Sequence, residues 1–256
     1  MSIAIRSARG RPRPRRRGAA AAGIPLARRL LDRLLASLVE ALFPADCFLC
    51  GDPLPFRQSG STCLPCWQGL PWAPGLSIRK GPLRAVLWGA DYAGPFRRLV
   101  HGLKFEGMDY LGPLLGEAGA RRMEALLCGD PARADLVVPV PLHWRRRLGR
   151  GYNQARLLAE PIALRAGLPL DAHLLSRPRA GRRQLGLSRT ERLRSLDGCY
   201  RVAGARRAAL RGRTILLVDD VVTTGATLEA CARALRGAGA AAVIGCVLAR
   251  TPRVRG

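Results

Sequence analysis

The sequence lacks two features whose absence limits its possible functions. It contains no uninterrupted apolar stretch of about 18 residues, so we expect no membrane-spanning helix. It contains only two lysines, Lys80 and Lys104, and neither lies in the Gly-x-x-x-x-Gly-Lys-Ser/Thr loop of P-loop ATPases. An integral membrane protein and a P-loop ATPase are therefore both disfavoured.

We expect no secretory signal in the N-terminal region. The first 23 residues are basic, but the next apolar stretch, residues 24–43, is interrupted by charged side chains such as Arg28, Asp32 and Glu40. We therefore expect a cytoplasmic protein whose thiols are kept reduced. A basic leader without acidic residues is also typical of organelle transit peptides, and this alternative stays open.

Acidic residues are scarce relative to basic ones. The chain has 18 Asp and Glu against 43 Lys and Arg, which gives a formal net charge of +25. A coding bias explains the choice of Arg over Lys, but not the excess of basic residues. Arginine binds phosphate through two parallel hydrogen bonds and stacks on bases. The excess of basic residues therefore favours a polyanionic partner, with single-stranded DNA or another nucleic acid as the first candidate.

The segment 215–227 contains the most specific pattern in the chain. A short apolar strand ends in Asp219 and Asp220, a Thr/Gly loop follows, and a segment with helical spacing comes next. The N–H groups at a helix N-terminus favour phosphate, and carboxylates accept hydrogen bonds from a sugar diol. We therefore predict a ribose 5-phosphate pocket; the alternative is a core strand followed by a capped helix. The predicted phosphate-binding residues are Thr223, Thr224, Gly225, Ala226 and Thr227.

Two Cys-x-x-Cys pairs lie close together near the N-terminus. Cys47 and Cys50 form the first pair, and Cys63 and Cys66 form the second. Four thiolates at this spacing are typical of a tetrahedral structural zinc site. The alternatives are a disulfide pair and a redox dithiol; a reducing compartment argues against the first, and the two matched pairs argue against the second.

The chain divides into four regions. We expect a disordered basic tail over residues 1–23 and an amphipathic helix over residues 24–43. A zinc-ribbon-like module follows over residues 44–80, and an α/β domain extends over residues 84–250. In this domain, apolar strands alternate with helices, and this order favours a parallel sheet flanked by helices.

A second anion site is expected after the apolar strand at residues 136–140. The basic loop that follows contains Arg150 and precedes a helix, so it could bind pyrophosphate or a nucleic-acid backbone. The Arg-rich segment 177–194 is long and irregular, as lids often are. Lys104 is either a phosphate ligand or a solvated residue at a helix end.

These features together resemble the ComF family over residues 30–250. The resemblance rests on the segment 42–44 with the two Cys pairs, the segment 138–155, the segment 184–192, and the segment 219–227, which closely resembles the signature of type I phosphoribosyltransferases. It implies a zinc ribbon joined to a type I phosphoribosyltransferase-like domain that binds phosphoribosyl pyrophosphate (PRPP) with Mg²⁺. It also implies a role in DNA uptake during natural transformation.

The resemblance further implies roles for individual residues. Asp219 and Asp220 would hold the ribose hydroxyls and offset the positive charge that develops on the sugar during catalysis. The loop with Arg150 would face pyrophosphate, and the matching lid positions are Gln184, Ser188, Arg189 and Arg192. Membership of a family does not establish catalysis. The alternative is a single-stranded nucleic-acid-binding protein whose phosphoribosyltransferase fold is a non-catalytic ligand or phosphate site.

Overall fold

The computed structural model describes residues 46–54, 62–129, 133–143, 148–178, 196 and 198–252. The expected tail, the expected helix at residues 24–43, and Gln184, Arg189 and Arg192 lie outside these residues. The centre of the described part is a five-stranded sheet in the order β1-β2-β7-β6-β3. Its strands are β1 (Trp72–Ile78), β2 (Ala85–Asp91), β3 (Leu136–Pro139), β6 (Thr214–Val222) and β7 (Ala242–Arg250).

The sheet is parallel except at one edge. β2, β7, β6 and β3 run parallel to one another, whereas β1 pairs with β2 in the antiparallel direction. β3 ends at Pro139, opposite Val218 of β6. Among the described residues, the part of β6 beyond Val218 therefore has ladder partners on the β7 side only. This leaves space beside the carboxyl end of β6, where parallel α/β sheets bind ligands.

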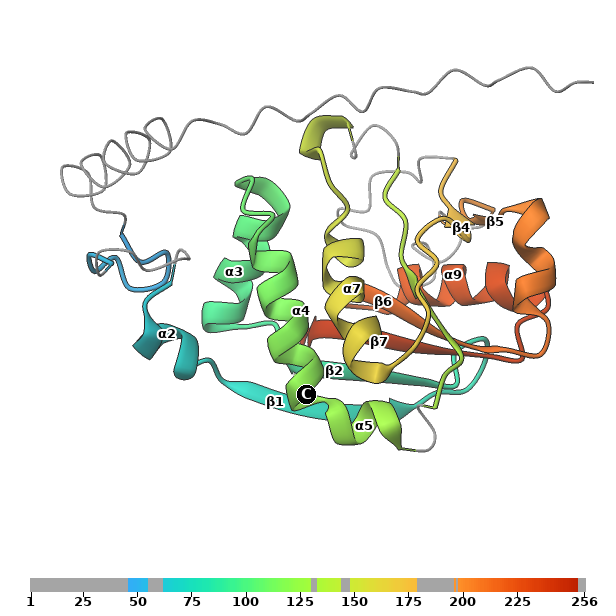
Figure 1. Cartoon of the computed structure of the whole chain (residues 1–256), viewed down its shortest axis with the longest axis horizontal. Helices are drawn as coiled ribbons and strands as arrows, with labels where there is room; N and C mark the ends of the chain where they lie inside the picture. Colours follow the sequence, from blue (N-terminus) through green and yellow to red (C-terminus); the bar gives the residue numbers. More distant parts are fainter. Residues whose placement is uncertain are drawn as a thin grey trace, which may run out of the picture.

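Helices cover both faces of the sheet. The described helical elements are α2 (Leu64–Gln68), α3 (Gly94–Phe105), α4 (Leu111–Arg122), α5 (Glu124–Cys128), α7 (Gln154–Ala166), the 3₁₀ helix η1 (Gly204–Leu210) and α9 (Ala226–Gly237). Figure 1 shows α3, α4 and α7 side by side over the sheet. Side chains alternate along β6, so Leu216 and Val218 join the core with α3, α4 and α7, while Ile215 and Leu217 join the core with α9. Burial on both faces explains why this strand is continuously apolar.

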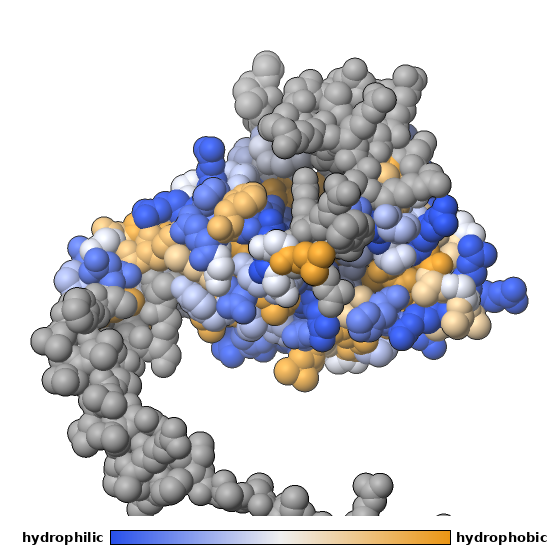
Figure 2. Space-filling model, turned by 90° about the horizontal axis from the view of Figure 1, so that it is seen from above, coloured by the Kyte–Doolittle hydropathy of each residue, from blue (hydrophilic) through white to orange (hydrophobic). Residues whose placement is uncertain are grey.

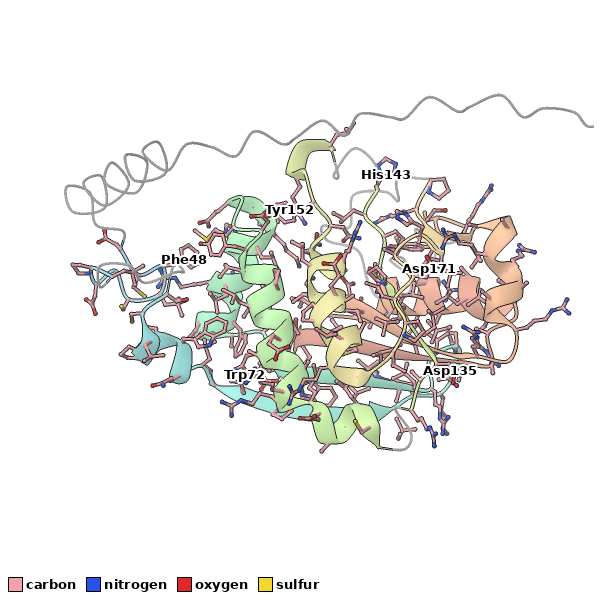
Figure 3. The ribbon with its side chains drawn as sticks, viewed as in Figure 1. Phe48, Trp72, Asp135, His143, Tyr152 and Asp171 are labelled. Carbon is pink, nitrogen blue, oxygen red and sulfur yellow. The ribbon has the colours of Figure 1, made fainter. Side chains whose placement is uncertain are left out.

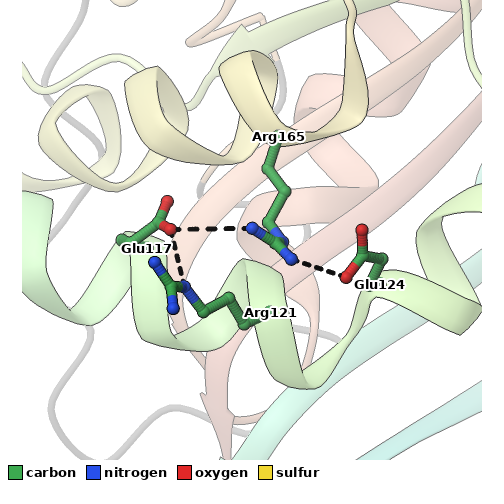
Figure 4. A network of polar contacts seen from close by, with 4 residues as sticks. All are labelled: Glu117, Arg121, Glu124 and Arg165. Carbon is green, nitrogen blue, oxygen red and sulfur yellow. Dashed lines mark hydrogen bonds and ion pairs between the residues drawn. The ribbon is translucent and has the colours of Figure 1, made fainter.

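A network of ion pairs joins α4, α5 and α7 (Figure 4). Arg165 lies 2.7 Å from a carboxylate oxygen of Glu124 and 3.7 Å from one of Glu117, and Arg121 contacts Glu117 at 2.8 Å. These side chains are partly exposed, so their contribution to stability is small. They link the carboxyl end of α7 to α4 and α5.

The sequence-based prediction of the fold class is confirmed, since a parallel sheet is flanked by helices and a cysteine cluster precedes it. The strand β1 lies outside the region that we assigned to the α/β domain. β1 falls within residues 44–80, the range we assigned to the zinc-ribbon-like module, yet it forms the edge of the main sheet. Pro74 is compatible with this position because an edge strand does not need every N–H for pairing.

The surface of the described residues carries no long apolar helix. Figure 2 shows one face, on which hydrophilic residues alternate with small groups of apolar residues. The exposed large apolar side chains come from separate elements and include Leu64, Ile78, Phe105, Leu148 and Leu164. No described helix has both the length and the apolar character needed to cross a membrane.

Candidate ligand cleft and metal centre

The loop after β6 has a shape that suits an anion. Gly225 has a φ of +84°, a left-handed conformation that favours glycine, and α9 begins at the next residue. The loop borders a small hollow of about 30 Å³ that is lined by residues 219 and 221–228. Backbone N–H groups at a helix N-terminus attract phosphate. The residues predicted to bind phosphate, 223–227, therefore lie together around one hollow, and phosphate binding stays a prediction.

A larger cleft of about 700 Å³ opens beside this loop. It lies where the carboxyl end of β6, the end of α3 and the start of α7 meet. We call it the acid cleft, and define it by Lys104, Arg150, Gln154, Asp219, Asp220 and Thr227. The structure thus brings four predicted ribose-phosphate residues, Asp219, Asp220, Thr223 and Thr227, together with Arg150, which was predicted to face pyrophosphate.

Asp220 is the more deeply buried of the two acids, with 3% of its surface exposed. Alternation along β6 places it on the same side as Leu216 and Val218, toward α3. Its Oδ1 lies 2.7 Å from Lys104 Nζ, whereas its Oδ2 is buried and has no hydrogen-bond partner among the described residues. A buried carboxylate oxygen without a donor is costly. This atom therefore marks a position at which the hydroxyl of a ligand can donate.

Asp219 is partly exposed to the cleft. Burial, followed by the negative charge of Asp220, raises the pKa of Asp219 to about 7, although the positive charge of Lys104 acts in the opposite direction. Its Oδ1 accepts a hydrogen bond from the backbone N of Asp220 at 2.9 Å. The Asp219 carboxyl is thus partly protonated near neutral pH. A hydroxyl donor or a cation that enters the cleft would stabilise its charged form.

Arg150 reaches the cleft from the turn before α7. Its guanidinium donates to Gln154 Oε1 at 2.6 Å and lies 5.4 Å from the centre of the Phe105 ring. Asn153 caps α7 through its side-chain oxygen, and its Nδ2 donates to Val140 O at 3.1 Å. The cap ties the turn to the end of β3, so Arg150 is held beside the acids.

The four cysteines of the two Cys-x-x-Cys pairs come together as predicted. Their Sγ atoms lie within 4.8 Å of one another, and those of Cys50 and Cys63 are 3.7 Å apart. Sulfurs around a tetrahedral zinc with bonds of about 2.3 Å are about 3.8 Å apart. The four sulfurs therefore lie close enough together to hold a metal ion.

The cysteine cluster is attached to α3. Arg98 donates to the backbone oxygen of Phe48 at 2.6 Å and also to that of Leu49, and its guanidinium lies 5.5 Å from the centre of the Phe48 ring. Figure 3 shows Phe48 beside this helix. A Cβ on Gly102 would lie only 3.1 Å from the Phe48 ring, so the glycine allows the close approach. The same helix carries Lys104 into the acid cleft.

The sequence is similar to several known proteins. It matches the family described as phosphoribosyl transferase domain over residues 155–255. It is 35% identical over 211 residues to the DNA utilization protein YhgH of Escherichia coli (strain K12), and the match covers 80% of this chain and 84% of that protein. It is also 30% identical over 154 residues to Competence protein F of Haemophilus influenzae, covering 58% of this chain and 65% of that protein.

The chain belongs to the ComF family. This confirms the resemblance expected from the Cys pairs and the segment 219–227. Among solved structures, adenine phosphoribosyltransferase from Leishmania tarentolae is 15% identical, with a TM-score of 0.37, and the match covers 68% of this chain and 80% of that chain.

Tyr200 is a cleft residue of this ComF chain that the sequence did not predict. Tyr200 lines the acid cleft, is 5% exposed, and has the Arg177 guanidinium 5.2 Å from the centre of its ring. Burial raises the pKa of Tyr200, so its hydroxyl stays neutral. Tyr200 belongs to no motif and follows the segment 177–194 in the chain. Its sequence neighbours therefore contain no signal that could have located it in the cleft.

Proposed function

We propose that this protein binds PRPP in the acid cleft and acts in DNA uptake during natural competence. One observation carries the PRPP proposal: the buried Asp220 Oδ2, without a donor among the described residues, lies in a cleft that also contains Arg150 and a phosphate-type loop. The role in DNA uptake is supported by the relatives named DNA utilization protein and Competence protein F.

The groups of PRPP match the groups along the cleft. The ribose hydroxyls donate to Asp219 and Asp220, the 5-phosphate accepts hydrogen bonds from the N–H groups of residues 223–227, and the diphosphate lies toward Arg150. When a nucleophile displaces the diphosphate at C1, positive charge develops on the sugar, and the carboxylates offset it. Bound together with PRPP, Mg²⁺ would supply further neutralisation of the diphosphate, and oxygen atoms are its preferred ligands. The proposed lid residues are Gln184, Arg189 and Arg192.

Calorimetry with PRPP and Mg²⁺ tests the proposal. We expect the native protein to bind, and the combined Asp219→Asn and Asp220→Asn variant to lose affinity by about 10-fold or more, because the hydroxyl acceptors are weakened. The control is Glu117→Gln with Glu124→Gln, which also removes two carboxylates but from the network in Figure 4. Failure of the native protein to bind PRPP rejects the proposal. Release of diphosphate in the presence of candidate bases or oligonucleotides then measures turnover.

We also propose that Cys47, Cys50, Cys63 and Cys66 hold a structural Zn²⁺. The 3.7 Å separation of the Cys50 and Cys63 sulfurs and the closeness of all four sulfurs support this assignment. In such a site zinc has no redox role, and it supplies folding energy by joining segments that have few other contacts.

A second candidate function is the binding of single-stranded nucleic acid. The net charge of +25 favours it. If it is correct, log affinity for an oligonucleotide should fall with log salt concentration, by about 0.7 per phosphate neutralised on a single strand. Binding that does not depend on salt would exclude this electrostatic mode. If the combined Asp219→Asn and Asp220→Asn variant keeps its DNA affinity but loses PRPP, the two ligands occupy separate sites.

A further inference from the structure

Lys104 is one of the few lysines of this chain, and it lies beside the most buried carboxylate among the described residues. It is one of two lysines among 43 basic residues. It lies in the last turn of α3, its side chain is 22% exposed, and its Nζ is 2.7 Å from Asp220 Oδ1. A ligand hydroxyl that donates to the unpartnered Oδ2 of Asp220 shares the negative charge of the carboxylate with the Lys104 ammonium on Oδ1, and so weakens the hold of Asp220 on that ammonium.

The chemistry of lysine suits such a weakened hold. Its ammonium is a compact charge on a flexible stem, whereas the planar guanidinium of arginine pairs with a carboxylate in a fixed two-bond geometry. Nearly every other basic residue of this chain is arginine. At Asp220, however, the cation is one that can rotate away without breaking two parallel hydrogen bonds.

The helix that carries Lys104 is itself well anchored. Tyr152, which Figure 3 shows near the end of α3, donates from its hydroxyl to Leu103 O at 2.6 Å. Arg98 of the same helix donates to the backbone oxygen of Phe48 in the segment that carries the cysteine cluster. An exchange of partners by Lys104 therefore requires rotation of its side chain only, within a cleft that also holds Arg150.

We propose that Lys104 is a displaceable cation of the acid cleft. The ribose hydroxyls of PRPP take over Asp220, and the released ammonium then binds an oxygen of the ligand's diphosphate beside Arg150. This inference rests on the proposed function. It assigns to Lys104 a contact with the diphosphate, in addition to the neutralisation of Asp220. It predicts that Lys104 distinguishes PRPP from ribose 5-phosphate, which has the same hydroxyls and 5-phosphate but no diphosphate.

Calorimetric titration of PRPP and of ribose 5-phosphate, each with Mg²⁺, tests this role in the full chain. We expect Lys104→Met to weaken PRPP binding by about 10-fold or more, because a charge-assisted hydrogen bond is lost. Binding of ribose 5-phosphate should be unchanged or tighter, because its hydroxyls no longer share the charge of Asp220 with the ammonium. The control is Lys80→Met, which removes the other lysine from an exposed position and should change neither affinity.

The outcomes separate the inference from the function on which it rests. If the native protein binds neither ligand, the proposed function fails and the inference fails with it. If the native protein binds both and Lys104→Met weakens both equally, or weakens neither, only the role of Lys104 is overturned. If the Lys104→Met variant does not fold, Lys104→Gln replaces it in the test, because glutamine keeps a donor to Asp220 but has no charge. We expect Lys104→Gln to weaken the binding of PRPP and to leave the binding of ribose 5-phosphate unchanged.

Discussion

Asp219 is an acid of the cleft whose ionisation is altered by burial and by a neighbouring charge. The side chain of an aspartate in an unfolded chain ionises near pH 4, at about 3.9. Burial, and then the charge of Asp220, raises the pKa of Asp219 to about 7 in the folded protein. At a pH between these two pKa values, Asp219 keeps its proton in the folded protein but has lost it in the unfolded chain. The contribution of this group to stability is therefore largest below pH about 4 and is lost as the pH rises to about 7.

Replacing Asp219 by asparagine should remove this decrease in stability with rising pH, because asparagine does not ionise. We expect the Asp219→Asn variant to exceed the native protein in free energy of unfolding by about 1–3 kcal/mol at pH 8, and by less at pH 5. Urea denaturation at the two pH values measures the difference. An equal change at both values would show that Asp219 ionises in the folded protein as it does in the unfolded chain. The same substitution should weaken PRPP binding, so stability and function oppose each other at this residue.

At the scale of elements, the packing of α4 on α7 depends on glycine. A Cβ on Gly116 would lie 2.5 Å from Pro161 Cγ and 2.8 Å from the backbone oxygen of Leu158. The backbone oxygen cannot move without displacing the helix. On the same helix, a Cβ on Gly119 would have no atom nearer than 3.6 Å, which is an ordinary contact. The two glycines therefore differ in whether a methyl group fits.

Alanine at the two positions should give opposite results. We expect Gly116→Ala to lower the free energy of unfolding by about 1–3 kcal/mol through overpacking. Gly119→Ala should be neutral or stabilising by up to about 1 kcal/mol, because alanine favours helix. Thermal denaturation measures both, with a shift of about 2–4 °C for each kcal/mol in a chain of this size. Equal midpoints for the two variants would contradict the close packing of α4 on α7.

At the scale of the whole molecule, α3 connects the cysteine cluster with the acid cleft. Arg98 and Phe48 hold the cluster on one side of the helix, and Lys104 enters the cleft from its end. The segment that contains the cluster includes few buried apolar residues, among them Cys47 and Leu54. A metal ion would therefore supply much of the stability of this part of the molecule.

Metal analysis tests this dependence directly. We expect about one zinc per chain in the native protein, and none in the combined Cys50→Ser and Cys63→Ser variant. The variant should also unfold at a temperature lower by about 2–4 °C or more, equivalent to at least about 1 kcal/mol. Cys128→Ser is the matched control, because Cys128 is exposed and lies outside the cluster. Zinc retained by the double variant would show that other residues bind the metal.

The sequence by itself determined the features that depend on residues close together in the chain. The apolar run of β6, the two acids at its end and the Thr/Gly loop before α9 are neighbours in the chain, so their order alone indicated a strand, a loop and a helix. The two Cys-x-x-Cys pairs indicated a four-sulfur cluster for the same reason, since each tight turn presents two thiols. These predictions needed no knowledge of how distant segments pack.

Only the tertiary structure decided which distant residues share the cleft. The sequence left Lys104 as either a phosphate ligand or a solvated residue, and its pairing with Asp220 depends on how α3 docks on the sheet. Tyr200 and the edge strand β1 were missed because their positions follow from the order of the strands. Periodicity determines which face of an element is buried, whereas the contacts between elements are set by the packing of the whole core.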